Sequence, residues 1–112
     1  MNIKLLLGFA ACLLSTQVLA LGVVGNIAAG KVKANTVCAA CHGLDGNKTL
    51  DNTYPKLAGQ YPDYLLKSLK EYKSGKRSNA IMAGQAQALS DSDMANLASY
   101  YGSLPSQGGI IK

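Results

Sequence analysis

Cys38-Ala39-Ala40-Cys41-His42 is the stretch that decides the fold of this chain of 112 residues. Two thiols stand three positions apart, and an imidazole follows the second thiol directly. This spacing is the attachment pattern of c-type haem, because two such thiols can add to the two vinyl groups of one porphyrin while the histidine binds the iron. We therefore predict one covalent haem c, attached through Cys38 and Cys41, with His42 as an axial iron ligand.

The residue inventory separates this prediction from three other uses of the motif. His42 is the one histidine of the chain, and Cys12 is the one further cysteine. A zinc site lacks a fourth ligand, since no pattern of carboxylates completes the set. A thioredoxin-like dithiol lacks a preceding strand, and a disulfide within one helical turn would be strained. Covalent haem is the hypothesis that gives all three motif residues a role.

The single histidine also limits the ligand on the other face of the iron. A second histidine from the same chain is excluded, which leaves methionine, lysine, water or an open position. Met94 falls inside a predicted helix, where packing is its expected role, whereas Met82 lies in an uncharged segment that we predict to be irregular. We predict Met82 as the sixth ligand, with packing over the haem edge as its alternative role. Histidine and methionine together raise the reduction potential of a haem.

Residues 1–20 have the composition of an export signal: Lys4, then an apolar core, then a small-residue site that ends at Ala20. We predict cleavage after Ala20 and a periplasmic location. An uncleaved membrane anchor is the alternative, because no charged residue occurs between Lys4 and Lys31. Lipid attachment at Cys12 is a further alternative, which the sequence around this residue fits poorly.

Length and charge limit the kinds of protein that the chain can be. The 11 basic and 6 acidic residues of the full chain give a formal net charge of +5, which by itself names no partner. We predict one domain over residues 21–105 and a loose tail over 106–112, which excludes a multi-domain enzyme. A domain of this size buries only about 60–70% of its unfolded surface, so a large cofactor is expected to complete its core.

The hydrophobic periodicity of residues 21–112 is helical, without an internal repeat or the alternation of a strand. Helices are predicted from Asn26 to His42, from Pro62 to Gly75 and from Ser90 to Leu104. Ser90 and Asp93 form a capping box at the start of the last one. Irregular segments are predicted over 43–60, wrapped around the cofactor, and over 76–89.

These motifs, in this order, resemble the class I c-type cytochromes, most closely the single-haem units of dihaem periplasmic cytochromes c. The matching features are the pentapeptide with Gly43, Tyr54-Pro55-Lys56-Leu57-Ala58-Gly59-Gln60, Tyr64-Leu65, Gly75-Lys76-Arg77, Met82 and the stretch from Leu89 to Tyr101. The resemblance implies an all-α fold of three to four short helices around one haem. It also implies that the N-terminal and C-terminal helices cross near the haem.

The resemblance assigns roles to further residues. It implies that the carbonyl of Pro55 accepts a hydrogen bond from the far ring nitrogen of His42. Gln60, Tyr64 and Arg77 are expected to meet the haem rim or its propionates. The alternatives are a rigid turn at Pro55, core packing for Tyr64 and a solvated Arg77.

Two departures from the family pattern carry expectations of their own. Met82 is followed by Ala83-Gly84, where many relatives have proline, so we expect a soft loop and an iron–sulfur bond that breaks easily. The chain also has no tryptophan, so tyrosines are expected to pack against the haem.

The predicted function is that of a single-electron carrier rather than an enzyme. Its expected partners are periplasmic or membrane-bound redox proteins with an acidic docking face, and neither nucleic acid nor a small-molecule substrate is expected. Six lysines are expected to steer this encounter: Lys48, Lys56, Lys67, Lys70, Lys73 and Lys76. A haem subunit bound permanently to a dehydrogenase and a ligand-binding haem protein with an open sixth position are the alternatives.

Overall fold

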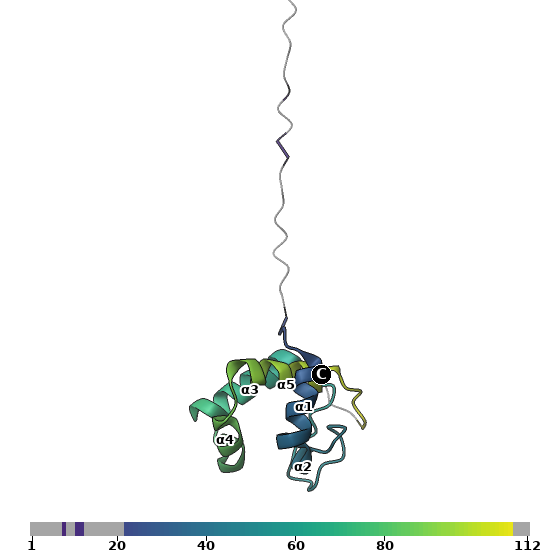
Figure 1. Ribbon diagram of the computed structural model, residues 1–112, viewed down its shortest axis with the longest axis vertical. Coiled ribbons are helices and arrows are strands. Elements are labelled where there is room, and N and C mark those ends of the chain that lie inside the picture. Colours follow the sequence, from purple (N-terminus) through teal and green to yellow (C-terminus); the bar gives the residue numbers. More distant parts are fainter. Residues whose placement is uncertain (1–7, 9–10, 13–21, 109–112) are drawn as a thin grey trace, which may run out of the picture.

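The computed structural model describes residues 8, 11–12 and 22–108, and all regular structure in this part of the chain is helical. The elements are α1 (Ile27–Lys33), a π-helical segment (Ala34–Cys38), α2 (Ala39–His42), α3 (Pro62–Ser74), α4 (Ala80–Gln87) and α5 (Asp91–Ser103). In Figure 1, α3 and α5 run across the top, while α4 lies below them on one side and α1 and α2 on the other. The all-α prediction is confirmed.

The first helical run continues from α1 through the π-helical segment into α2. It starts where predicted, because the side chain of Asn26 accepts a hydrogen bond from the backbone N–H of Ala29 at 2.8 Å. It ends where Gly43 takes a φ of 85°, a conformation that favours glycine. The sequence did not predict the π-helical segment, in which the N–H of Ala39 bonds to the carbonyl of Ala34. The turn directly before the two thiols is therefore wider than an α-helical turn.

The helices α3 and α5 also begin and end as predicted. Pro62 occupies the first turn of α3, and Gly75 ends this helix with a φ of 82°. At the start of α5, Ser90 and Asp93 exchange two hydrogen bonds of 3.0 Å, which completes the capping box.

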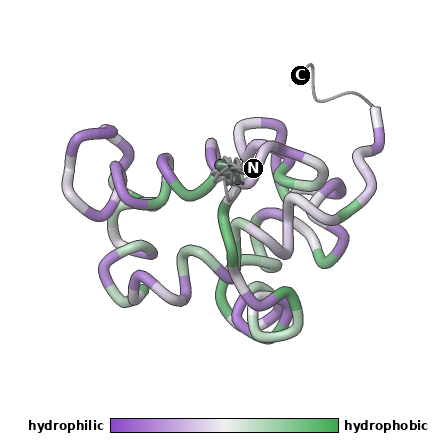
Figure 2. Tube along the Cα trace, turned by 90° about the horizontal axis from the view of Figure 1, so that it is seen from above, coloured by the Kyte–Doolittle hydropathy of each residue, from purple (hydrophilic) through white to green (hydrophobic). Residues whose placement is uncertain are grey.

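The hydrophobic core lies where α1 crosses α5 and where α3 packs on α5. A Cβ atom added at Gly30 of α1 would come within 2.1 Å of the carbonyl oxygen of Asn96 in α5, so this crossing depends on glycine. Met94 and Leu97 are fully buried in the same core. The crossing of the N-terminal and C-terminal helices, which the resemblance implied, is present in the structure. Figure 2 shows hydrophobic and hydrophilic residues interspersed along the chain.

The irregular segment predicted over 76–89 is wrong for most of its length, because residues 80–87 form α4. The side chain of Asn79 caps this helix by accepting a hydrogen bond from the N–H of Met82 at 3.0 Å. Only Ala86 of α4 is buried, so the helix has no apolar stripe from which its period could be recognised. Met82 therefore lies in the first turn of a capped helix, and the soft loop expected around it is wrong.

Residues 43–60 form the irregular loop that was predicted, without a regular element. Of the predicted tail, Gln107 contacts this loop: its N–H donates to the side-chain oxygen of Asn47 at 2.9 Å, and its carbonyl accepts from Lys56 at 3.0 Å. The predicted signal, apart from residues 8 and 11–12, and residues 109–112 lie outside the described part of the chain. No helix among the described residues has the length and apolar character needed to cross a bilayer.

Candidate haem-binding site

A cavity of about 510 Å³ opens between the α1–α2 side of the molecule and α4. It is lined by every residue that the sequence analysis placed at the site, namely Cys38, Cys41, His42, Pro55, Gln60, Tyr64, Arg77 and Met82. Its volume falls in the range of about 300–1,000 Å³ that is usual for cofactor sites. The fold thus brings residues that are up to 44 positions apart into one cavity wall.

The two cysteines lie at the end of the first helical run, and both line the cavity. Cys38 is the last residue of the π-helical segment and Cys41 lies in α2. Both are partly buried, and no disulfide joins them. Burial raises the pKa of the Cys38 thiol above its ordinary value, so this thiol is protonated at neutral pH. One occupant of the cavity can therefore reach two thiols at once.

A hydrogen bond to the loop fixes the orientation of the His42 ring. The residue is buried, and its Nδ1 lies 2.8 Å from the carbonyl oxygen of Pro55. A carbonyl oxygen can only accept, so in the neutral imidazole Nδ1 carries the proton and donates it to this bond. Nε2 is then left with a lone pair that can bind a metal. The ring of Tyr54 lies beside the imidazole, with its centroid 6.4 Å away.

Short backbone hydrogen bonds fold the loop over 43–60 back onto the helix end and so position Pro55. The N–H of Leu50 donates to the carbonyl of Cys41 at 3.0 Å. The carbonyl of Gly46 accepts from the N–H groups of Leu57 and Ala58 at 2.9 and 3.1 Å. The second contact closes the loop two residues beyond Pro55, so the carbonyl that faces His42 belongs to a fixed turn.

The two methionines of the described chain have different surroundings. Met82 is partly buried and lines the cavity together with Ile81 and Gln85. Met94 is 1% exposed, belongs to the buried hydrophobic core, and does not line the cavity. Only Met82 of this pair can contact a ligand that occupies the cavity.

The donors in the cavity fit an iron porphyrin better than a bare metal ion. Within the described residues, no three histidine, cysteine or acidic side chains converge on a point where they could hold an ion. The cavity instead offers two thiols, one imidazole and one thioether on a largely apolar wall, which is the set that a covalent haem uses. Two buried hydroxyls of the wall, on Ser68 and Tyr101, lack a hydrogen-bond partner among the described groups. An occupant is therefore expected to complete the wall.

Arg77 is fixed at the edge of the cavity by its own neighbours. Its guanidinium lies over the rings of Tyr64 and Tyr72, at 5.6 and 5.5 Å from their centroids. It also bonds to Glu71 at 3.3 Å and to the hydroxyl of Tyr64 at 3.4 Å. The hydrogen bond from Arg77 lowers the pKa of Tyr64. Arg77 is thus partnered by protein groups at the rim and is partly exposed there.

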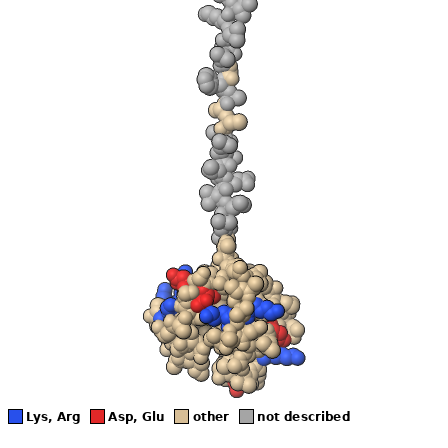
Figure 3. Space-filling model, in the orientation of Figure 1, with Lys and Arg blue, Asp and Glu red and all other residues tan. Residues whose placement is uncertain are grey.

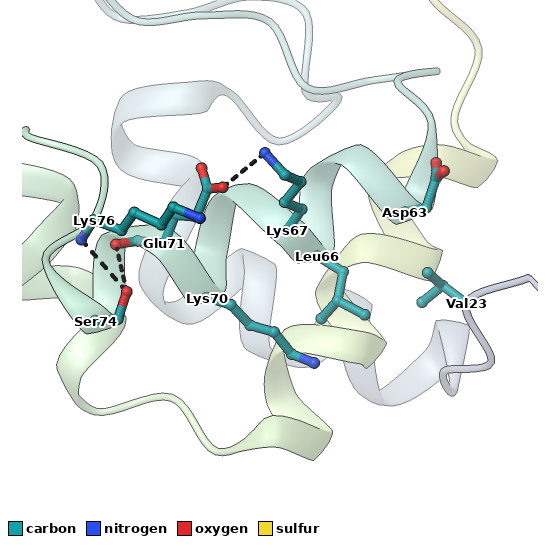
Figure 4. A pocket seen from close by; sticks show the side chains of 8 residues that line it. All are labelled: Val23, Asp63, Leu66, Lys67, Lys70, Glu71, Ser74 and Lys76. Carbon is teal, nitrogen blue, oxygen red and sulfur yellow. Dashed lines mark hydrogen bonds and ion pairs between the residues drawn. The ribbon is translucent and has the colours of Figure 1, made fainter.

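Most of the lysines predicted to steer a partner lie away from the cavity. Lys67, Lys70 and Lys76 line a second hollow of about 500 Å³ on the outer face of α3 (Figure 4), where Lys67 pairs with Glu71 at 2.7 Å. Lys73 donates a hydrogen bond to the carbonyl of Leu89. Of the six lysines in the predicted set, Lys56 is the one that lines the cavity. In Figure 3 the charged groups gather above the lobe formed by α4, which has no charged residue.

The sequence did not single out Tyr72, Ser68 or Leu97 as lining residues, although all three face the cavity. Their positions on α3 and α5 follow from the way these helices pack, and no motif marks them. The i, i+4 spacing of Tyr64, Ser68 and Tyr72 is the one signal that could have placed them on a common face of α3.

Comparisons with known proteins agree with this site. Residues 27–105 match the family model of cytochrome c. A cytochrome c4 of Pseudomonas aeruginosa is 51% identical over 79 residues, which cover 70% of this chain and 38% of that protein. Cytochrome c-554(548) of Halomonas halodenitrificans is 48% identical over 82 residues, which cover 70% of this chain and 96% of that protein.

A solved structure has the same fold. The crystal structure of reduced recombinant cytochrome c4 from Pseudomonas stutzeri superposes with a TM-score of 0.69 at 39% identity, covering 75% of this chain and 48% of that one. The chain thus spans about half or less of the length of the cytochrome c4 proteins it matches, and nearly the whole length of cytochrome c-554(548).

Proposed function

The chain belongs to the cytochrome c family, and on this premise we propose that it is a carrier of single electrons with one covalent haem c. The observation that supports this proposal best is the cavity in which Cys38, Cys41, His42 and Met82 meet. When bound, the haem supplies an iron that changes between the ferrous and ferric states by one electron.

The proposed attachment uses both thiols of the pentapeptide. Each S–H group adds across one vinyl C=C bond, with the sulfur bonding to one carbon and the hydrogen to the other, so no oxidant is consumed. The partly buried positions of Cys38 and Cys41 on the cavity wall support this role. The thioether bonds would keep the cofactor in place during repeated electron transfer.

The proposed axial ligands come from two separate parts of the chain. His42 would bind the iron through Nε2, because Pro55 holds the proton on Nδ1. Met82 would bind from α4, where Asn79 fixes the backbone of the helix start. If His42 and Met82 both bound the iron, no coordination position would be left for a substrate, which favours electron transfer over catalysis.

We also propose how a redox partner approaches. The rim of the cavity is formed mainly by uncharged residues such as Val37, Ile81 and Gln85, and the partner would dock there through a small interface. The lysines on the outer face of α3 would attract a partner with an acidic docking surface from a distance. Export to the periplasm, with cleavage after Ala20, remains part of this proposal.

The attachment and the electron transfer are tested on purified protein. A molecular mass that includes one haem after denaturation, together with a reversible one-electron redox titration, is the expected result. A haem lost on denaturation would contradict covalent attachment. Carbon monoxide binding to the reduced protein at neutral pH would instead favour a haem protein with an open sixth position.

The steering is tested with lysine variants. Lys70→Gln should lower the rate of electron transfer to an acidic redox partner at low ionic strength and have no effect at high salt. Lys31→Gln, which removes an exposed lysine of α1 outside both hollows, serves as the matched control. Rates that do not depend on ionic strength would contradict steering, and co-purification with a dehydrogenase at a fixed ratio would support the alternative of a permanent subunit.

A further inference from the structure

Tyr101 places a buried hydroxyl in the cavity wall that the electron-carrier proposal leaves without a role. The residue lies in α5, is 3% exposed and lines the cavity beside Cys38. Its hydroxyl oxygen is buried and has no hydrogen-bond partner among the described groups. A buried hydroxyl without a partner lowers stability, so such groups are usually satisfied by a neighbour or by a bound ligand.

The ring of Tyr101 is held firmly, so the direction of its hydroxyl is set by the fold. The carbonyl of Tyr101 accepts a hydrogen bond from the N–H of Gly59 at 2.9 Å. Its ring packs against Tyr100, with centroids 5.2 Å apart. A Cβ atom at Gly46 would come within 3.1 Å of this ring, so the loop over 43–60 closes on it from the other side.

The thiol of Cys38 lies beside this hydroxyl in the cavity wall. Burial raises the pKa of Tyr101, and the interaction with Cys38 raises it further. The hydroxyl and the thiol thus interact, although the hydroxyl makes no hydrogen bond of standard geometry. A free thiol both donates and accepts weakly, whereas a thioether sulfur can only accept. After attachment of the haem, the sulfur of Cys38 could therefore only accept a hydrogen bond, and the O–H group of Tyr101 beside it would be free to donate one.

We propose that Tyr101 donates a hydrogen bond to the thioether sulfur of Cys38 and thereby raises the reduction potential of the haem. This inference rests on the proposed haem attachment. The hydrogen of the bond would carry a partial positive charge toward the haem edge, inside a wall of low dielectric. The ferric haem has one more positive charge than the ferrous haem, so this dipole disfavours the oxidised state. Tyr101 would act on the potential through Cys38, as a positioning residue.

The test compares two neighbouring tyrosines of α5 in the haem-loaded protein. Tyr101→Phe removes the hydroxyl in the cavity, and Tyr100→Phe removes a hydroxyl from a buried residue that does not line the cavity. Redox titration should give a lower potential for Tyr101→Phe and an unchanged potential for Tyr100→Phe, with the same haem content in both. Equal potentials for Tyr101→Phe and the unmodified protein would overturn the inference.

A second measurement covers the case in which Tyr101→Phe does not fold or bind haem. In the NMR spectrum of the reduced, unmodified protein, the hydroxyl proton of Tyr101 should exchange slowly and show a nuclear Overhauser effect to the Cβ protons of Cys38. A hydroxyl proton that exchanges rapidly, or that lies near another acceptor, would overturn the inference. A protein without covalent haem would refute the proposed function as well, so the haem content is measured first.

Discussion

The helices α4 and α5 are neighbours in the sequence but have different roles in the molecule. Five residues of the 13-residue α5 are buried, and it packs on both α1 and α3. The eight-residue α4 buries only Ala86 and contacts α3. We conclude that α5 mainly stabilises the fold, whereas α4 mainly brings side chains, Met82 among them, to the cavity. The comparison predicts that changes to the core residues of α5 lower stability and that changes in α4 alter the site.

The largest expected effect on stability is that of Met94→Ala in α5. Removing this fully buried side chain leaves a cavity in the hydrophobic core. The free energy of unfolding should fall by about 2–5 kcal/mol. Denaturant unfolding measures this loss, and Met94→Leu should cost less than about 1.5 kcal/mol because the volume is kept. A loss of similar size for Ile81→Ala, a half-exposed residue of α4 in the cavity wall, would contradict the comparison.

Removing the N-caps of the two helices should have smaller effects, and these effects should differ between α5 and α4. Ser90→Ala removes the cap of α5 and should lower the free energy of unfolding by about 0.5–2 kcal/mol. Asn79→Ala removes the cap of α4 and should mainly speed hydrogen exchange of the amides in that helix, Met82 included. Native-state hydrogen exchange distinguishes the two results. Amides of α4 that stay protected in Asn79→Ala would show that α4 is held by more than its cap and its contact with α3.

The smallest expected effect is a pH dependence carried by Asp93. Its pKa is lowered by the backbone N–H of Ser90, with a smaller contribution from Lys33 at 3.6 Å. A lowered pKa in the folded state stabilises the fold above the unfolded pKa, about 4, and this stabilisation is lost as the pH falls below it. Because the carboxylate is partly exposed, we expect a difference of a few tenths of a kcal/mol.

Unfolding of the protein and of Asp93→Asn between pH 3 and pH 6 measures that difference. The amide of asparagine can still accept the hydrogen bond from Ser90, so this control removes only the charge. The stability difference between the two proteins should shrink toward low pH. A difference that stays constant over this range would show that the charge of Asp93 contributes nothing to α5.

What the sequence predicted well depends on local chemistry. The pentapeptide marks three residues of the site by spacing alone, and the caps at Asn26 and Ser90 mark the starts of the first and last helical runs. The crossing of α1 and α5 was expected from the resemblance alone, since nothing local to Gly30 shows that Asn96 lies against it.

What the sequence did not predict depends on contacts between distant segments. The helix α4 was not predicted, because a helix that is mostly exposed and uncharged has no amphipathic pattern. Asn79 could have indicated the N-terminal cap of this helix. The separation of the lysines of α3 from the cavity follows from the face on which α3 packs. The buried hydroxyl of Tyr101 needs both the helix and the loop over 43–60 to be in place.

The most direct test of the central claim is the optical spectrum of the oxidised, haem-loaded protein. Ligation by Met82 predicts a weak sulfur-to-iron charge-transfer band at the red end of the visible range. This band should vanish in Met82→Ala and persist in Met94→Leu, whose side chain lies in the core. A band that survives Met82→Ala, or that is lost in Met94→Leu while the protein stays folded, would contradict the assignment of α4 to the site and α5 to the fold.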